Sequence, residues 1–397
     1  MLNQDFLKKI YDLKLHYQKV SWDTPLQLQT ILRKNIKDWE MAIGVSEFII
    51  NEKKFKHKFP KLIEGGGLIK SLVAEQATDE QVAEHKASFF QGNHFLDLTA
   101  GLAIDTMAFA KNFSKLIAIE ANPDLIPLLQ WNANKLGFQN IEFVYDTAEN
   151  FLSYNTSLFD LVYLDPSRKI QQKKVYHPKD YSPNIFEILP SLNRITKKVL
   201  IKLSPMIEVQ ELSKWFQNIE WIWLISKNRE CKEILVLINT EYNTKPQYRL
   251  SILNKQHVYV YELDPMSIKK ENKEFRLVEY SWVLIPDVVF VKSHALFYLQ
   301  NVTQGFLTDA QDGVLLLSQK TQNDYGKLKK IVQVLSLKDF EKYQKKYNLW
   351  KAQVIKKHFS LKVEEIRKKW KILEGNSDTL IFVKIANQSY VIHGVED

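Results

Sequence analysis

The segment from Asn93 to Glu120, NHFLDLTAGLAIDTMAFAKNFSKLIAIE, constrains the fold more than any other part of the chain. His94 to Leu98 is an apolar run short enough for a buried strand, and Thr99-Ala100-Gly101 follows it as a small-residue turn. Apolar residues at helical spacing from Ile104 to Asn112 predict a helix, and Lys115 to Ile119 predicts a second buried strand. The segment therefore predicts the strand, helix and strand of a parallel α/β sheet.

The turn and the residue that closes the second strand restrict the ligand of such a sheet. Glu120 lies roughly twenty residues after the turn, where nucleoside-binding sheets place an acid that accepts hydrogen bonds from ribose hydroxyls. The turn holds only Gly101, between Ala100 and Ala103, whereas a pyrophosphate needs several backbone amides at close approach. This disfavours a dinucleotide. It favours a ligand with a ribose and no phosphate, such as S-adenosylmethionine.

This stretch resembles the first motif of the class I S-adenosylmethionine-dependent methyltransferases, an acidic residue followed by a small-residue turn with glycines. The resemblance implies that the residues at the motif's positions bind the cofactor, and these are Asp97, Thr99, Gly101 and Ala103. The chain departs from the motif at Ala100 and Ala103, where the family usually has glycine. For this stretch taken alone, a βαβ fold with a purely structural turn is the alternative.

Acidic residues also follow the next two predicted strands. The third strand, Gln139 to Tyr145, ends at Asp146-Thr147, and the fourth, Phe159 to Leu164, ends at Asp165. Ligands of open α/β sheets bind outside the carboxyl ends of the strands, so the acids after all four strands are expected to line one site. By the resemblance, Asp146 reaches the adenine amino group, and Thr147 and Asp165 belong to the same cofactor site.

Asp165-Pro166-Ser167-Arg168 stands where nucleic-acid methyltransferases carry their substrate-facing motif. Enzymes that methylate amino groups usually have a stacking aromatic residue at the position of Arg168, and a guanidinium can stack or hold a phosphate in its place. We predict that Asp165 orients the methyl acceptor or takes its proton and that Arg168 contacts the substrate. Lys202, in the fifth strand, either contacts a phosphate or pairs with a buried acid. Direct transfer is chiefly a matter of positioning and requires no metal.

The chain has one cysteine, Cys231, which excludes an internal disulfide and any multi-cysteine zinc site. Methylation at carbon five of a pyrimidine needs a cysteine nucleophile near the end of the fourth or fifth strand. The fifth strand, Val199 to Leu203, runs instead into Ser204-Pro205-Met206. We therefore predict a structural role for Cys231 and disfavour this chemistry.

With 397 residues the chain exceeds what one core usually serves, so two or three domains are expected. We predict an N-terminal helical region over 1–74, followed by a Rossmann-like methyltransferase domain with a seven-stranded sheet over 75–246. Within it, Thr78 is expected to cap a helix that leads into the first strand. A β-rich connection and ferredoxin-like domain are expected over 247–326, and a basic α+β domain over 327–397.

The positive charge is concentrated at the C-terminus. Residues 327–397 hold 16 Lys and Arg against 8 Asp and Glu, or +8, of a net charge of +9 for the whole chain. A basic domain attached to a nearly neutral one favours delivery of a polyanion, and RNA is the obvious candidate. The alternative is a solvated, lysine-rich surface.

Three further segments resemble one methyltransferase family with a ferredoxin-like insert and a C-terminal domain likened to the RNA-binding THUMP module. They are IKLSPM at 201–206, NRECKE at 228–233 and HFSLKVEEIRKKWKILEGNSDTLIFVKI at 358–385. The resemblance implies an RNA substrate, either tRNA or rRNA, contacted by Arg367, Lys368 and Lys369.

Two other functions stay open at this level: a catalytically idle RNA-binding protein that retains the fold, and a methyltransferase for a small molecule or a protein. No segment has the apolar length of a membrane span or a secretion signal, so a soluble, cytoplasmic protein is expected.

Overall fold

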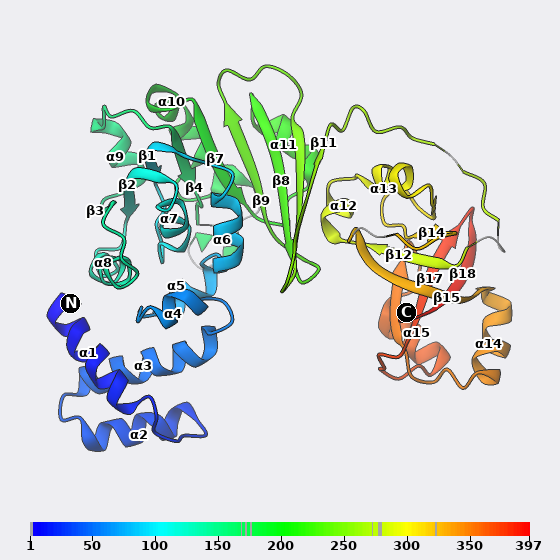
Figure 1. The fold of residues 1–397 in the computed structure, drawn as a ribbon, viewed down its shortest axis with the longest axis horizontal. Helices are drawn as coiled ribbons and strands as arrows, with labels where there is room; N and C mark the ends of the chain where they lie inside the picture. The colour runs from blue at the N-terminus through cyan, green and yellow to red at the C-terminus, as the bar shows by residue number, and fades with distance from the viewer. Residues whose placement is uncertain are drawn as a thin grey trace. The chain divides into compact units, whose positions relative to one another are not determined.

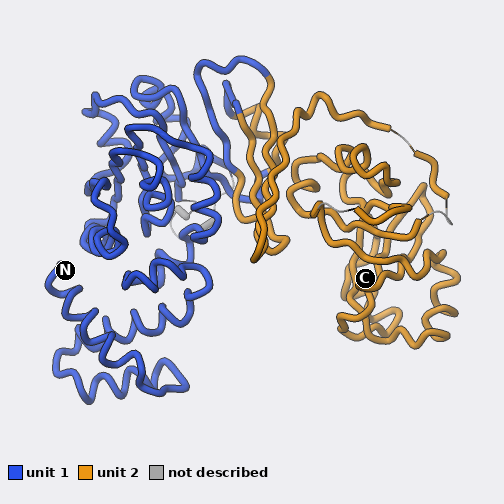
Figure 2. The backbone as a smooth tube through the Cα atoms, in the orientation of Figure 1, with its two compact units in different colours: residues 1–207, 216–220, 235–244 blue, residues 208–215, 221–234, 245–397 orange. Residues whose placement is uncertain are grey.

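The computed structural model describes residues 3–167, 169–170, 173–174, 177–271, 273–276, 280–321 and 324–397. The chain divides into two compact units, which Figure 2 distinguishes by colour. The first unit comprises residues 1–207, 216–220 and 235–244, and the second comprises residues 208–215, 221–234 and 245–397.

Helices make up the chain before the first strand, as predicted (Figure 1). They are α1 (Gln4–Tyr17), α2 (Pro25–Asn35), α3 (Trp39–Phe55), α4 (Pro60–Glu64), α5 (Ser71–Gln76) and α6 (Glu80–Ala87). The first three begin at side-chain caps, Asn3, Thr24 and Asp38, each of which accepts a hydrogen bond from a first-turn amide. The apolar stripe of α2 is buried at Leu28 and Leu32.

The cap of α6 differs from the predicted one. Asp79 is the N-cap and accepts hydrogen bonds from the amides of Gln81 and Val82, so the prediction of Thr78 is wrong. A carboxylate caps a helix as well as a hydroxyl does. The hydroxyl of Thr78 is buried and donates instead to the Asp105 carboxylate.

Nine strands form the first sheet, in the order β11-β10-β8-β9-β7-β4-β1-β2-β3. They are β1 (Gly92–Asp97), β2 (Phe113–Glu120), β3 (Ile141–Tyr145), β4 (Leu161–Leu164), β7 (Lys198–Leu203), β8 (Ile219–Lys227), β9 (Glu230–Asn239), β10 (Gln247–Leu253) and β11 (Val258–Leu263). β1 pairs in parallel with β2 and β4, β2 with β3, and β4 with β7. The carboxyl ends of these five strands therefore share one edge of the sheet.

The sheet has two strands more than predicted. β10 pairs in parallel with β8, and β11 pairs with β10 in antiparallel. Both strands lie after residue 246, where the sequence predicted a separate connection. Their apolar residues, such as Leu250 and Ile252, are buried by this pairing.

Helices connect the strands of this sheet: α7 (Ile104–Phe109), α8 (Ile126–Lys135), α9 (Ala148–Tyr154), α10 (Ile185–Ile195) and α11 (Val209–Trp215). The same region contains the short helix η1 (Pro178–Asp180) and the paired strands β5 (Lys169–Ile170) and β6 (Lys173–Lys174). All four residues of β4 are buried, as are Phe95 and Leu96 of β1. Such apolar runs are typical of central parallel strands covered on both faces.

A second sheet of seven strands has the order β13-β14-β12-β15-β18-β17-β16. Its strands are β12 (Trp282–Pro286), β13 (Phe306–Leu307), β14 (Leu315–Leu317), β15 (Gly326–Ser336), β16 (Gln353–Lys357), β17 (Asp378–Ile385) and β18 (Gln388–Val395). Its helices are α12 (Val288–Lys292), α13 (Leu296–Thr303), α14 (Leu337–Lys346) and α15 (Val363–Trp370). The predicted boundary after residue 326 falls inside β15, and β15 pairs with β12 in the same sheet.

Candidate functional site

The four acids predicted to form a site lie at one edge of the first sheet. Asp97 and Glu120 are the last residues of β1 and β2, and Asp146 and Asp165 directly follow β3 and β4. These strands are parallel neighbours in the order β4-β1-β2-β3 (Figure 1). The row expected from the sequence is therefore present in the structure.

Asp97 is buried beneath the turn that follows β1. One carboxylate oxygen accepts a hydrogen bond from the Thr99 amide at 2.9 Å, and the other accepts one from the Thr106 hydroxyl at 2.6 Å. Burial raises the pKa of the Asp97 carboxyl to about 7, although these two hydrogen bonds act in the opposite direction. The negative charges of Asp105 and Asp165 raise the pKa further.

Glu120 faces the same turn from the end of β2. Its carboxylate accepts hydrogen bonds from the Gly101 amide at 2.9 Å and from the Asn122 amide at 2.8 Å. Burial outweighs these bonds and raises the pKa of the Glu120 carboxyl above its ordinary value. The turn has left-handed backbone at Gly101, with φ of 56°, and at Ala103, with φ of 58°. Only at Gly101 is this conformation free of strain.

Asp146 is half-buried, and its carboxylate is held by residues of α9 and its N-cap. It accepts hydrogen bonds from the Thr147 amide, the Asn150 side chain and the Tyr154 hydroxyl, at 2.7 to 2.8 Å. The partial burial of Asp146 acts to raise its pKa, but these hydrogen bonds outweigh it and lower the pKa. The Thr147 hydroxyl caps α9 by accepting a hydrogen bond from the Asn150 amide.

Asp165 forms an ion pair that the sequence suggested only as an alternative. Lys202 Nζ, on β7, lies 2.5 Å from Asp165 Oδ2. β4 and β7 are parallel neighbours with Leu164 opposite Ile201, which places the two side chains at adjacent strand ends. Arg168, the other predicted catalytic residue, lies outside the described residues.

The ion pair continues into a buried cluster that the sequence analysis missed. Lys202 Nζ also donates to the Thr78 hydroxyl at 2.8 Å, and that hydroxyl donates to Asp105 at 2.7 Å. Asp105 Oδ1 lies 3.0 Å from Nζ of Lys86, and the Tyr163 hydroxyl donates to Asp105 Oδ2 at 2.9 Å. One sequence signal was Lys86, whose helical spacing puts it on the same face of α6 as Val82 and Ala83.

Cys231 is buried in β9 and follows neither β4 nor β7. Burial raises the pKa of its thiol to about 12, so the thiolate needed for nucleophilic attack is scarce near neutral pH. Within the described ranges no group of three or more His, Cys, Asp or Glu is placed to hold a metal ion. No helix in the described part of the chain has the length and apolar character needed to cross a membrane.

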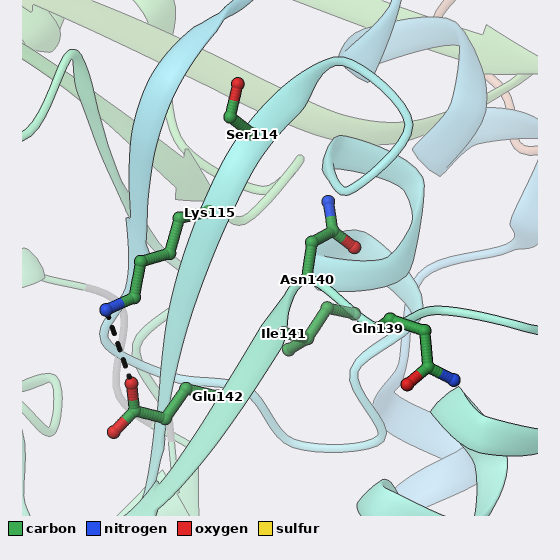
Figure 3. Close-up of a pocket in the computed structure, with 6 residues that line it drawn as sticks. All are labelled: Ser114, Lys115, Gln139, Asn140, Ile141 and Glu142. Carbon is green, nitrogen blue, oxygen red and sulfur yellow. Dashed lines mark ion pairs between the residues drawn. The ribbon is translucent and has the colours of Figure 1, made fainter.

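A surface hollow lies at the opposite ends of two site strands (Figure 3). Its lining residues are Ser114, Lys115, Gln139, Asn140, Ile141 and Glu142. They belong to the amino-terminal halves of β2 and β3 and to the residues before β3. Lys115 and Glu142 form an ion pair of 3.7 Å there. The hollow is therefore distinct from the row of acids.

The three cations predicted to contact RNA end α15, and they differ from one another. Lys368 and Lys369 are exposed. Arg367 is half-buried, and its guanidinium donates to the Ile372 carbonyl at 3.2 Å. Arg367 thus closes its own helix, which leaves the two lysines as the exposed cations of the three.

Two family models match the chain. One, described as "Conserved hypothetical protein 95", matches residues 78–234, and the other, described as "THUMP domain-like", matches residues 328–394. A solved structure of a candidate methyltransferase from Porphyromonas gingivalis W83 is similar to this chain, with a TM-score of 0.87 and 18% identity. The match covers 100% of this chain and 99% of the other protein's chain. This chain has a methyltransferase fold with a THUMP-like domain. The family resemblance and the α/β fold class predicted from the sequence are confirmed, except that the first sheet has nine strands and not seven.

The region matched by the "Conserved hypothetical protein 95" model contains the whole candidate site, because residues 78–234 include the turn, the four acids and Lys202. The THUMP-like part comprises β15 to β18 with α14 and α15. Among curated proteins, the 23S rRNA (uracil(747)-C(5))-methyltransferase RlmC of Proteus mirabilis (strain HI4320) is 27% identical over 169 residues. The match covers 41% of this chain and 44% of RlmC, so the chain spans less than half of that relative's length.

Proposed function

We propose that the protein is an S-adenosylmethionine-dependent methyltransferase that methylates RNA, either tRNA or rRNA, by direct transfer. The observation that carries the proposal is the row of four carboxylates along the edge formed by β4, β1, β2 and β3. Bound there, S-adenosylmethionine supplies an electrophilic methyl group on a positively charged sulfonium.

The residues of the row fit such a cofactor. Its sulfonium and ammonium groups are cationic, and carboxylates at the mouth of the site are complementary to them. Both Glu120 oxygens accept backbone amides, and an ionised carboxylate has further acceptor positions, here for the ribose hydroxyls. A Cβ added at Gly101 would come no closer than 3.9 Å to another atom, so the turn has room above it.

Roles follow for the remaining cofactor residues. Asp97 and Thr99 fix the turn, and the backbone of Gly101 and Ala103 faces the cofactor. Asp146 accepts a hydrogen bond from the adenine amino group, and Thr147 supports that role by holding the start of α9. The Asp165 carboxylate, which has about a third of its side-chain surface exposed, orients the acceptor or receives its proton. Arg168 contacts the substrate in this proposal.

RNA is the proposed acceptor because the basic charge is concentrated in the THUMP-like domain. Residues 327–397 carry +8, and four lysines of α14 and α15 are exposed: Lys345, Lys346, Lys368 and Lys369. Clustered cations of this kind bind the phosphate backbone of nucleic acids. We propose that this activity takes place in the cytoplasm.

The proposal excludes the covalent route to carbon five that a uracil-C5 enzyme requires. That route begins with attack by a thiolate, and Cys231 is buried with a pKa of about 12. RlmC is named for uracil-C5 methylation, so its chemistry is not part of what is proposed for this chain. Direct transfer to a nitrogen or oxygen of the RNA is compatible with a site built from carboxylates.

Mass spectrometry of nucleosides tests the acceptor. RNA from cells with and without the gene would be digested, and the loss of one methylated nucleoside in the deletion strain is expected. The gene carrying Asp165→Ala should fail to restore that nucleoside. Restoration by this variant, or identical nucleoside profiles in the two strains, would contradict the proposal.

A further inference from the structure

Lys202 contacts residues on two sides, at the exposed edge of the site and in the interior of the domain. Its ammonium lies 2.5 Å from Asp165 Oδ2 and donates to the Thr78 hydroxyl at 2.8 Å. The side chain of Lys202 is 12% exposed, while that of Asp165 is 33% exposed. The carboxylate is therefore the open side of the pair.

The Thr78 hydroxyl is itself held by a buried carboxylate, that of Asp105. It donates to Asp105 Oδ2 at 2.7 Å, and Asp105 also pairs with Lys86, whose side chain is fully buried. Burial acts to raise the pKa of Asp105, but the charges of Lys86 and Lys202 outweigh burial and lower it. Asp105 is thus held as a carboxylate, and its negative charge complements both ammonium groups.

Two consecutive residues of α7 serve the two sides of the site. Asp105 bonds to Thr78 and thereby to the Asp165 side, whereas Thr106 donates to the Asp97 carboxylate beneath the cofactor turn at 2.6 Å. On one side the Thr78 hydroxyl holds Lys202, the partner of Asp165, and on the other the Thr106 hydroxyl holds the Asp97 carboxylate. Removal of either hydroxyl should therefore disturb a different property of the protein.

We propose that Lys202, held by Thr78 and Asp105, is a positioning residue that sets the direction of the Asp165 carboxylate toward the methyl acceptor. This inference rests on the proposed function. A lysine ammonium ends a flexible stem with several rotatable bonds, so one contact to Asp165 would leave the pair mobile. The second contact, to Thr78, fixes the ammonium at both sides. A displacement of about 1 Å at a reacting group can reduce a rate roughly a hundredfold.

Three threonine variants test the proposal: Thr78→Val, Thr78→Ser and Thr106→Val. Two quantities are measured for each, the affinity for S-adenosylhomocysteine by calorimetry and the rate of tritiated methyl transfer to total RNA from cells that lack the gene. Thr78→Val should lower the rate at saturating RNA by about thirtyfold or more, with cofactor affinity and the KM for RNA nearly unchanged. Thr78→Ser keeps the hydroxyl and should restore the rate. Thr106→Val should instead weaken cofactor binding.

A purely structural role for the cluster predicts a different result. Thr78→Val would then lose cofactor affinity, as expected for Thr106→Val, together with thermal stability, and Thr78→Ser would show no selective recovery of the rate. Either that pattern or a wild-type rate in Thr78→Val would overturn the proposal. Lys202→Met serves as a second variant and should reproduce the loss of rate with cofactor binding intact.

A separate measurement distinguishes failure of this inference from failure of the proposed function. If the wild-type protein transfers no methyl group to RNA, the proposed acceptor is wrong. The restraint of Lys202 by Thr78 is then tested by NMR of protein with labelled lysine. The ammonium signal of Lys202 is assigned by its loss in Lys202→Met. The signal should shift in both Thr78→Val and Asp165→Asn. An unchanged signal in Thr78→Val would contradict the restraint by Thr78.

Discussion

The backbone amide of Asp165 donates a hydrogen bond to the Thr99 hydroxyl, with 2.7 Å between nitrogen and oxygen. Thr99 belongs to the turn after β1, and its own amide donates to the Asp97 carboxylate at 2.9 Å. A single threonine therefore joins the turn proposed to hold the cofactor to the carboxylate proposed to face the acceptor. Cofactor binding and acceptor positioning therefore both depend on the hydrogen bonds of Thr99.

Thr99→Val removes the hydroxyl and leaves the Asp165 amide without its acceptor. An unsatisfied, partly buried amide costs about 1–3 kcal/mol, so the free energy of unfolding in urea should fall by roughly that amount. The affinity for S-adenosylhomocysteine, measured by calorimetry, should fall as well. Thr99→Ser retains the hydroxyl and is the matched control. Equal losses in the two variants would contradict this account, because Thr99→Ser keeps the hydroxyl that accepts the hydrogen bond from the Asp165 amide.

Ala103→Gly should stabilise the protein. Ala103 has a φ of 58°, in the left-handed region that costs a residue with a side chain of order 1–3 kcal/mol. Glycine loses about 0.5–1 kcal/mol through its greater freedom in the unfolded chain, so a net gain is expected. Ala100, in the same turn, has no such φ, and Ala100→Gly should destabilise. A loss of stability in both variants, read from thermal unfolding, would contradict the strain assigned to Ala103.

Asp97 should make stability depend on pH. Burial raises the pKa of its carboxyl from about 3.8 to about 7 in the folded protein. Between these values the unfolded chain has lost the proton that the folded chain still holds. Stability therefore falls as the pH rises through this window, by up to about 1.4 kcal/mol per unit, and levels off above about pH 7.

Asp97→Asn carries no proton to lose and should lack this part of the pH dependence. Unfolding in urea at a series of pH values would be compared for the variant and the wild type. Relative to the wild type, the variant should gain stability steadily from about pH 4 to about pH 7. Parallel curves for the two proteins would mean that Asp97 is ionised throughout, against the effect of its burial.

Lys368→Glu with Lys369→Glu should weaken RNA binding and make it less sensitive to salt. Each lysine that neutralises a phosphate contributes about 0.7–0.9 to the slope of log affinity against log salt concentration. Fluorescence anisotropy with labelled RNA measures this slope. The same reversals at Lys8 and Lys9, which are exposed on α1, are the control and should change it little. An unchanged affinity in the first variant would remove the case for RNA delivery by α15.

The sequence predicted the edge of acids because the signal is local. Short apolar runs that end at Asp97, Glu120 and Asp165 are read directly from neighbouring residues, and parallel pairing then brings their ends together. The seven-stranded sheet predicted was nevertheless too small. The pairing of Tyr248 with Ile222 is a contact between distant segments, and no local pattern distinguishes an added strand from a linker.

The cluster around Asp105 could not be predicted for a related reason. Its members come from α6, the segment before α6, α7, β4 and β7, and each alone resembles an ordinary helix or strand residue. Thr78 shows this clearly, since its sequence context fits an N-cap and Asp79 takes that place. Only the fold shows that the Thr78 hydroxyl lies between Lys202 and Asp105.

Calorimetric titration with S-adenosylhomocysteine tests the central claim most directly. Wild-type protein should bind with a stoichiometry near one, and Glu120→Ala should bind much more weakly because the ribose hydroxyls lose their acceptor. Glu142→Ala, at the other end of the strands, should bind like the wild type. Absence of heat with the wild type at protein concentrations well above micromolar, or equal binding by Glu120→Ala, would contradict the account.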